Sequence, residues 1–224
     1  MNALLAIIVP VFNEADVLPD LLARLDAFYQ RGVDIIMVDG GSTDNTADII
    51  LRSPFRLIVS EKGRARQMNA GARATSADNL LFLHADTQLP DTADAVLTEA
   101  LLTHHWGRFD VKIQGQHVVL PIIAQMMNWR SRLTGIATGD QAIFIRRLIF
   151  ERIGGFPDQN LMEDIAMSQQ LKRVGKPACL RDKVITSGRR WEQYGLWRTV
   201  LLMWRLRFAY WMGTSPDVLA ERYR

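Results

Sequence analysis

The sequence predicts an α/β fold in which a mostly parallel β-sheet is flanked by helices. Over about the first hundred residues, apolar segments of strand length alternate with segments whose apolar residues have helical spacing. Each apolar segment ends in a polar or glycine-containing turn, as buried strands do at the edge of a parallel sheet. Because crossovers between parallel strands are right-handed, the carboxyl ends of these strands are expected to meet at one edge.

The elements of the first half follow from this alternation. Acidic residues after the first strand suit the first turn of a helix, and Gly32 ends that helix. Gly40 and Gly41 allow a tight turn after the second strand. Strands are expected at residues 4–11, 33–38, 55–59 and 80–83, and helices over 13–30, around 49–51, over 67–74 and over 90–102.

The second half is less regular. Strands are expected at residues 107–113, 139–146 and 178–185, helices over 118–129, 163–174 and after 191, and a turn over 150–156. No linker divides the chain, so we expect one α/β domain over residues 1–190 and a helical extension over residues 191–224.

Composition limits the classes of function. The net charge of +3 is too small to indicate nucleic-acid binding. A single cysteine, Cys179, excludes an internal disulfide and fits a reducing compartment. No uncharged apolar stretch reaches the length of about 18 residues that a membrane-spanning helix needs. The apolar start breaks at Pro10 and has no basic leader, so it is expected to be a core strand of a cytoplasmic protein.

Carboxylates end two of the expected parallel strands. Asp39 follows the second strand and Asp86 the fourth, at the edge where ligands of open α/β sheets bind. Asp86 could hold a divalent cation that in turn holds a diphosphate, or it could simply cap a strand end. Lys62, Arg64 and Arg190 could stabilise phosphates, although charged loops are more often only solvated. The dinucleotide and Walker fingerprints are absent, so neither a hydride-transferring Rossmann enzyme nor a P-loop ATPase is expected.

An ordered set of short motifs resembles the family-two glycosyltransferases of GT-A fold over about residues 4–192. The motifs are Val9–Glu14, Val38–Asp44, Leu83–Asp86, Gly154–Phe156, Glu163-Asp164 and Arg190-Trp191. Gly139–Gln141 and Leu161–Asp164 are similar to a small bacterial branch labelled arsenosugar-biosynthesis or selenium-associated glycosyltransferases, a label taken from genomic context.

The resemblance implies transfer of a sugar from a nucleotide-sugar donor, typically UDP-linked, to a hydroxyl acceptor, with inversion. Asp86 would bind Mn²⁺ or Mg²⁺ bridging the diphosphate, and Asp164 would be the catalytic base. Asp39 would accept a hydrogen bond from the base ring. Arg190 and Trp191 would lie near the diphosphate and the acceptor. The nucleotide pocket would be lined by Pro10, Phe12 and Glu14, with Lys62 and Arg64 near the phosphates.

Two positions depart from the family pattern. His84 replaces the usual first aspartate of the metal motif; a neutral imidazole can ligate a transition metal or hydrogen-bond a ribose, but it carries no negative charge. Ser187 stands where the glutamine of the last motif is expected. The processive members of the family also have transmembrane helices, which argues against polymer extrusion here.

Three acidic residues could face the acceptor. Glu163 and Asp164 are adjacent on an expected helix, so their side chains point about 100° apart and only one should face the acceptor. The family match favours Asp164, which leaves Glu163 to cap the helix. Asp140 could face the acceptor cleft or hold a loop through backbone hydrogen bonds.

The C-terminal extension combines aromatic and arginine residues on an amphipathic helix. Its apolar stripe passes through Leu201, Trp204 and Phe208. Such a helix can pack on its own domain, lie on the inner face of a membrane or mediate a homodimer. A membrane contact would suit a lipid-linked acceptor, whereas a small-molecule acceptor needs none.

Two other functions remain open at this point. A sugar nucleotidyltransferase has the same layout, but it needs a glycine-rich phosphate loop after the first strand, and residues 10–14 contain no glycine. A membrane-associated binding module with a decayed site would account for His84 and the C-terminal helix.

Overall fold

The computed structural model describes residues 3–223, apart from the side chains of Arg190, Trp191 and Tyr194. The strands are β1 (Leu5–Val11), β2 (Asp34–Asp39), β3 (Arg56–Val59), β4 (Asn79–Phe82), β5 (Thr87–Gln88), β6 (Trp106–Gln114), β7 (Phe144–Arg146) and β8 (Ala178–Ser187). The helices are α1 (Leu18–Gln30), α2 (Thr46–Leu51), α3 (Arg64–Arg73), α4 (Ala93–Thr103), α5 (Leu120–Thr134), α6 (Arg147–Arg152), α7 (Glu163–Val174), α8 (Arg189–Tyr194), α9 (Leu196–Trp211) and α10 (Pro216–Tyr223).

The strands form one sheet in the order β3-β2-β1-β4-β7-β6-β8-β5. β1 to β4 are parallel, β7 runs antiparallel between β4 and β6, and β6 and β8 are parallel to each other. The predicted α/β fold with a mostly parallel sheet flanked by helices is confirmed. The carboxyl ends of β1, β2 and β4 lie at one edge, as the sequence predicted.

Alternation along β1 places its side chains in two cores. Leu5, Ile7 and Val9 pack with α1 and α4, whereas Ala6 and Ile8 pack with α3 and α7. All five side chains are buried, as expected for a central parallel strand that has helices on both faces.

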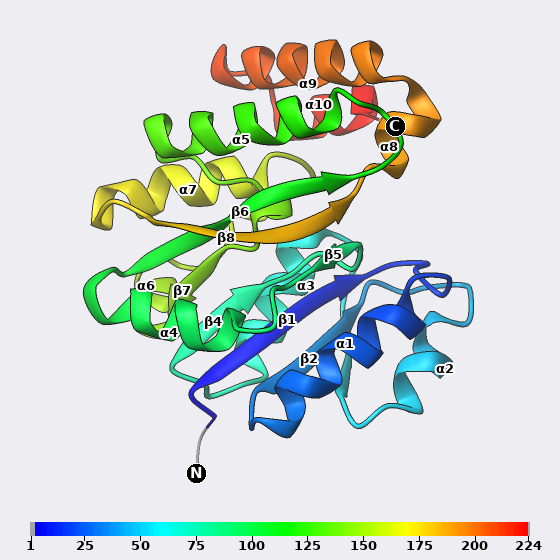
Figure 1. Cartoon of the computed structure of the whole chain (residues 1–224), viewed down its shortest axis with the longest axis vertical. Coiled ribbons are helices and arrows are strands. Elements are labelled where there is room, and N and C mark those ends of the chain that lie inside the picture. The colour runs from blue at the N-terminus through cyan, green and yellow to red at the C-terminus, as the bar shows by residue number, and fades with distance from the viewer. Residues whose placement is uncertain (1–2, 224) are drawn as a thin grey trace.

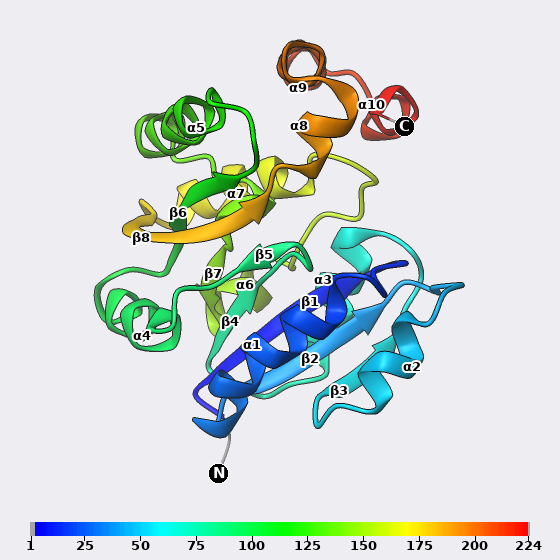
Figure 2. The same ribbon diagram turned by 45° about the vertical axis from the view of Figure 1, so that its right-hand side comes forward.

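The C-terminal helices form an upper layer beyond β6 and β8 (Figures 1 and 2). Leu206 of α9 and Leu219 of α10 are buried against Leu161 and Met162, the two residues before α7. The layer therefore covers the start of α7 with an apolar contact of its own.

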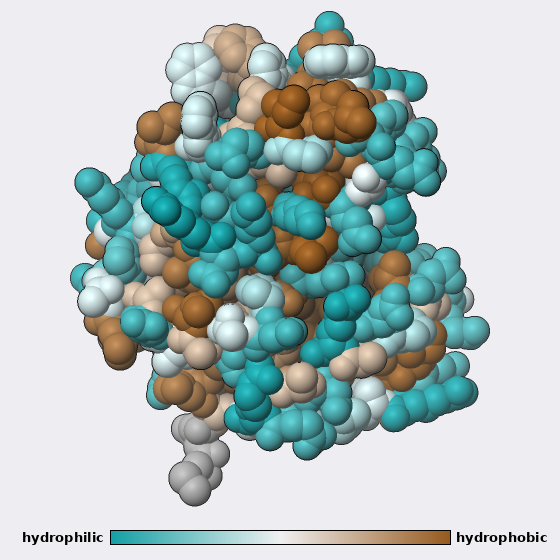
Figure 3. Space-filling view, viewed as in Figure 1, coloured by the Kyte–Doolittle hydropathy of each residue, from teal (hydrophilic) through white to brown (hydrophobic). Residues whose placement is uncertain are grey.

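The outer face of this layer carries apolar side chains (Figure 3). The predicted stripe of α9 points to solvent, with Leu201, Trp204 and Phe208 each more than half exposed. Its role at a membrane or in a dimer stays a prediction. Within residues 3–223, no helix has both the length and the apolar character needed to cross a membrane.

Two expectations for the second half are wrong. Residues 139–146 form a 3₁₀ turn (Gly139–Gln141) followed by the short strand β7, because Ala142 takes a left-handed conformation with a φ of 47° that breaks the strand. Part of the expected turn over 150–156 is helix α6, which Gly154 and Gly155 end at φ values of 82° and 79°.

Candidate active site

A cavity of about 760 Å³ lies between the carboxyl edge of the sheet and the C-terminal helices. The loops after β1 and β4 form one wall, and the 3₁₀ turn and the start of α7 form another. Helices α5, α9 and α10 complete it. The predicted site residues that line it are Pro10, Glu14, Arg64, His84, Asp86, Asp140, Glu163 and Asp164.

The other predicted site residues lie elsewhere or are not described. Nζ of Lys62 lies 3.7 Å from the ring centroid of Phe12, a cation–π contact outside the cavity lining. The Asp39 carboxylate is buried and accepts hydrogen bonds from the backbone N–H and the hydroxyl of Ser42. The side chains of Arg190 and Trp191 lie outside the described residues, so their predicted roles stay predictions.

At one end of the cavity, carboxylates meet basic residues. Glu14 follows β1, and its carboxylate lies 3.8 Å from the guanidinium of Arg189. Burial raises the pKa of Glu14; Arg189 opposes this effect, and the negative charge of Asp86 adds to it. Oδ1 of Asp86 accepts a hydrogen bond of 3.3 Å from the Thr87 hydroxyl.

His84 contacts Asp140 across the middle of the cavity, with Nδ1 3.4 Å from Oδ1. Burial opposes ionisation of Asp140, but the hydrogen bond and charge of His84, together with the charge of Arg64, hold the pKa of Asp140 below its usual range. The position that departs from the family pattern thus pairs with a carboxylate from a distant part of the chain.

Asp164 is fixed at the start of α7 by two backbone N–H groups. Its Oδ2 accepts a hydrogen bond of 3.0 Å from Gly139, and its Oδ1 accepts one of 2.7 Å from Ile165. Each carboxylate oxygen has a second lone pair, so Asp164 can accept a further proton or hydrogen bond. A carboxylate is also favourable at the N-terminus of a helix.

Glu163, the residue before Asp164, is buried and has a raised pKa. Glu163 is 5% exposed, and burial followed by the negative charge of Asp164 raises its pKa, with Arg64 opposing. For Arg64, burial lowers the pKa, but the surrounding carboxylates, led by Glu163, outweigh it and raise the pKa above its ordinary value. Arg64 therefore stays charged beside both acidic residues.

Two cavity arginines were missed from the sequence. Arg130 of α5 and Arg207 of α9 line the cavity on the side of Asp164. In the sequence, Arg207 is one of several arginines interspersed among the aromatic residues of the C-terminal helix. At 100° per residue, Arg207 lies about 60° from Trp204 and about 100° from Phe208, at the border of the apolar stripe, and the helical spacing alone does not show that this border faces the cavity.

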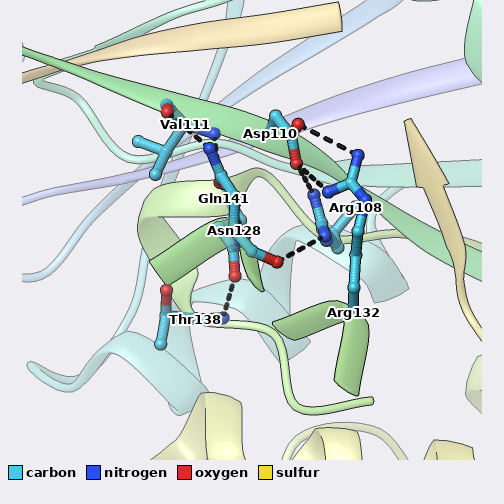
Figure 4. A network of polar contacts seen from close by, with 7 residues as sticks. All are labelled: Arg108, Asp110, Val111, Asn128, Arg132, Thr138 and Gln141. Carbon is cyan, nitrogen blue, oxygen red and sulfur yellow. Dashed lines mark hydrogen bonds and ion pairs between the residues drawn. The ribbon is translucent and has the colours of Figure 1, made fainter. Parts of the chain in front are cut away.

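A buried polar network holds the 3₁₀ turn in place (Figure 4). Asn128 of α5 exchanges hydrogen bonds with the backbone of Val111, and its Oδ1 accepts one of 3.5 Å from Gln141. Oε1 of Gln141 in turn accepts a hydrogen bond of 3.2 Å from the N–H of Thr138. The turn that carries Gly139 and Asp140 is therefore tied to both α5 and β6.

Gly139 is needed for the approach of His84. A Cβ at position 139 would lie 2.2 Å from Cε1 and 2.3 Å from Nε2 of the His84 ring. We expect Gly139→Ala to lower the free energy of unfolding by about 1–3 kcal/mol, because the ring must move away from Asp140. Chemical denaturation of the purified variant measures the change.

The matched control removes the ring. In the His84→Ala background there is room for the new Cβ, so adding Gly139→Ala should cost less than about 0.5 kcal/mol more. Equal losses in both backgrounds would contradict the steric explanation.

The described side chains contain no group of three or more histidine, cysteine, aspartate or glutamate residues arranged to hold a metal ion. A cation here would need ligands from a bound molecule as well as from Asp86. The donor set fits such a shared site, since Asp86 offers a cavity-lining carboxylate and Glu14 adds negative charge nearby.

Comparison with known proteins agrees with this geometry. A family model described as "Glycosyl transferase family 2" matches residues 6–149. Undecaprenyl-phosphate 4-deoxy-4-formamido-L-arabinose transferase from Pseudomonas syringae is 33% identical over 38% of the chain and 28% of its own length. Poly-β-1,6-N-acetyl-D-glucosamine synthase from Staphylococcus aureus is 30% identical over 39% of the chain and 23% of its own length. The matched region thus spans about a quarter of these relatives.

Solved structures share the fold. S. aureus TarS in complex with UDP superposes with a TM-score of 0.63 and 19% identity, covering 82% of this chain and 60% of its own. The mannosyltransferase PcManGT from Pyrobaculum calidifontis, in complex with GDP-Man and Mn²⁺, gives a TM-score of 0.64 and 20% identity, covering 100% of this chain and 69% of its own.

The family match covers β1 to β7 and the loops that carry Glu14, Asp86 and Asp140, and it ends before Asp164. The fold, the ligand-binding edge of the sheet and this match agree. The chain belongs to glycosyl transferase family 2.

Proposed function

We propose that this protein transfers a sugar from a UDP-linked donor to an acceptor hydroxyl, with inversion at the anomeric carbon. The observation that carries the proposal is the cavity, whose lining brings Glu14 and Asp86, from the loops after β1 and β4, together with Asp164 at the start of α7. A sugar placed between them would have its leaving group beside Asp86 and its acceptor beside Asp164. The UDP complex of TarS, a structural neighbour, supports the choice of nucleotide.

The reaction needs a base for the acceptor proton and positive charge for the leaving diphosphate. The bond from the anomeric carbon to the phosphate oxygen breaks, and its electron pair leaves with the nucleoside diphosphate. The acceptor oxygen bonds to the same carbon from the opposite face, and its proton passes to Asp164 as general base. Arg64 and Arg189 would stabilise the charge that grows on the leaving diphosphate. Because attack and departure occur on opposite faces in one step, the anomeric configuration inverts.

A divalent cation would assist departure. Asp86 would hold Mn²⁺ or Mg²⁺ together with phosphate oxygens of the donor, and the ion would supply Lewis-acid stabilisation of the leaving group. His84 is engaged with Asp140, so we assign it to positioning that carboxylate rather than to the metal. The Mn²⁺ complex of PcManGT supports the use of a metal by this fold.

The experiment is a donor screen by mass spectrometry. Purified protein is incubated with UDP- and GDP-sugars, with and without Mn²⁺, and release of the nucleoside diphosphate is followed. Metal-dependent release of UDP from one UDP-sugar supports the proposal. Release of pyrophosphate from a nucleoside triphosphate and a sugar phosphate would instead indicate a nucleotidyltransferase.

A further inference from the structure

Arg130 and Arg207 carry N–H groups that the described protein does not satisfy. Nε and Nη2 of Arg130 and Nε of Arg207 are shielded from solvent and have no hydrogen-bond partner within the described part of the chain. Both residues line the cavity. A guanidinium with unpaired buried N–H groups is costly, so such groups normally have partners.

The like charges of Arg130 and Arg207 make their burial in the unliganded protein less favourable still. Burial and the nearby charge of Arg207 lower the pKa of Arg130 to about 10. Burial also lowers the pKa of Arg207, against the attraction of Asp164 and Asp140. Two partly buried cations therefore lie near each other, and within the described residues neither forms an ion pair with a carboxylate.

Another arginine on the same helix shows the contrast. Arg132 of α5 forms two hydrogen bonds with Asp110, of 2.6 and 3.0 Å, and these bonds raise its pKa. Arg132 thus has a structural role and a carboxylate partner from β6. Arg130, two positions earlier, faces the cavity instead.

The pair lies on the acceptor side rather than the donor side. The charges that act on Arg130 and Arg207 include those of Asp164 and Asp140. Those that act on Glu14, at the donor end, come first from Arg189 and then from Asp86. Arg64 acts on Glu14 as well as on Asp140 and Asp164, so it links these two groups of charges.

We propose that Arg130 and Arg207 form a subsite for a phosphate-type oxyanion of the acceptor. This inference rests on the proposed function and names the acceptor class. A guanidinium pair offers forked N–H donors that match the oxygens of a phosphate group, and a bound dianion would neutralise both cations. The anion would anchor the acceptor so that its hydroxyl lies at Asp164.

A phosphate group together with a hydroxyl occurs on a free sugar or polyol phosphate and also on a lipid whose phosphate headgroup carries a hydroxyl. Met126, Met203 and Trp204 also line the cavity, and Met126 and Trp204 are 54% and 60% exposed on α5 and α9. The cavity thus reaches the apolar outer face of the upper layer, where an acyl or prenyl chain could lie. The experiment therefore compares both sources.

The test is calorimetric titration with inorganic phosphate and with dodecyl phosphate. Protein saturated with UDP and Mn²⁺ is used, so that the donor phosphates are already in place. Arg130→Gln and Arg207→Gln are each expected to weaken binding of both probes by about tenfold or more, since each removes charge-assisted hydrogen bonds. Arg205→Gln, an exposed neighbour on α9, is the matched control and should leave binding within about twofold.

The outcomes are separable. Much tighter binding of dodecyl phosphate than of inorganic phosphate identifies a lipid phosphate, and equal binding identifies a free ester; both support the subsite. Failure of both probes to bind, or binding that neither arginine variant changes, overturns it. If UDP itself does not bind, the proposed function fails, and the same titration of the unliganded protein still tests the subsite.

A second readout separates ligand binding from a structural role. Because Nε and Nη2 of Arg130 have no hydrogen-bond partner within the described residues, Arg130→Met is expected to raise the melting temperature while abolishing the stabilisation by dodecyl phosphate. Arg132→Met, which breaks a paired arginine, is expected to lower the melting temperature. A lower melting temperature for both variants, with phosphate stabilisation retained in Arg130→Met, would show that Arg130 is structural.

Discussion

Replacement of Asp164 by asparagine is expected to lower the rate of sugar transfer by about 10²–10⁴-fold, the usual contribution of a general base. The amide cannot take the acceptor proton, but it keeps the size of the side chain and can still accept from one of the two N–H groups that hold Asp164. Binding of UDP should stay within about twofold of the wild type, since Glu14 and Asp86 at the donor end are unchanged. Single-turnover transfer and a UDP titration measure the two effects separately.

Glu163→Gln is the matched control for this prediction. Glu163 is buried, with a pKa raised by burial and by the charge of Asp164, and it faces Arg64. Its replacement should cost less than about tenfold in rate, because it removes a charge but not the base. A large loss in Glu163→Gln together with an active Asp164→Asn would assign the base to Glu163 and refute the assignment made here.

Asp110→Ala is expected to lower the free energy of unfolding by about 3–5 kcal/mol. Asp110 is 8% exposed and pairs with Arg108, which is fully buried, and with Arg132 (Figure 4). Removal of the carboxylate leaves the Arg108 guanidinium buried without its counter-charge, which is far more costly than loss of a surface pair. Urea denaturation measures the change.

Asp34→Ala provides the comparison. Asp34 pairs with Arg56, whose side chain is 51% exposed, and such pairs contribute about 0–1 kcal/mol. Similar losses of unfolding free energy in Asp110→Ala and Asp34→Ala would contradict the larger contribution assigned to the buried pair.

The same pair predicts a pH dependence. Burial opposes ionisation of Asp110, but hydrogen bonds and charge from Arg132 and Arg108 lower its pKa in the folded protein. A lowered folded pKa gives stability that is present above the unfolded pKa and is lost as the pH falls through the folded pKa. The wild type should therefore lose stability on acidification below about pH 4, and Asp110→Ala should lose less over the same range.

The sequence predicts the part of the cavity around Glu14 and Asp86 better than the part around Asp140 and Arg207. Segments such as Leu5–Val11 and Asp34–Asp39 are largely apolar on both faces, which identifies them as strands of a parallel sheet. The loops that carry the polar residues follow these strands directly in the sequence, so their positions can be predicted from it. The helix at Glu163 is likewise marked by acidic residues in its first turn and by Gly175 after its end.

The part around Asp140 and Arg207 depends on contacts between distant segments. The 3₁₀ turn at residues 139–141 is held by Asn128 of α5, and Arg207 reaches the cavity only because α9 packs on Leu161 and Met162. Local patterns do not encode which face of an amphipathic helix meets the domain. The stripe of Leu201 and Phe208 is exposed, while the face that carries Leu206 packs on the domain and Arg207 beside it lines the cavity.

The most direct test of the proposed function is calorimetric titration of UDP into the wild type and Asp86→Asn, each with and without Mn²⁺. The wild type is expected to bind UDP at least about tenfold more tightly with Mn²⁺, because Asp86 would hold the cation and the cation would add attraction for the diphosphate. Asp86→Asn should lose that gain, since it lacks the anionic ligand, yet keep metal-free binding. Absence of UDP binding by the wild type with Mn²⁺, or an equal gain in both proteins, would contradict the assignment of this cavity.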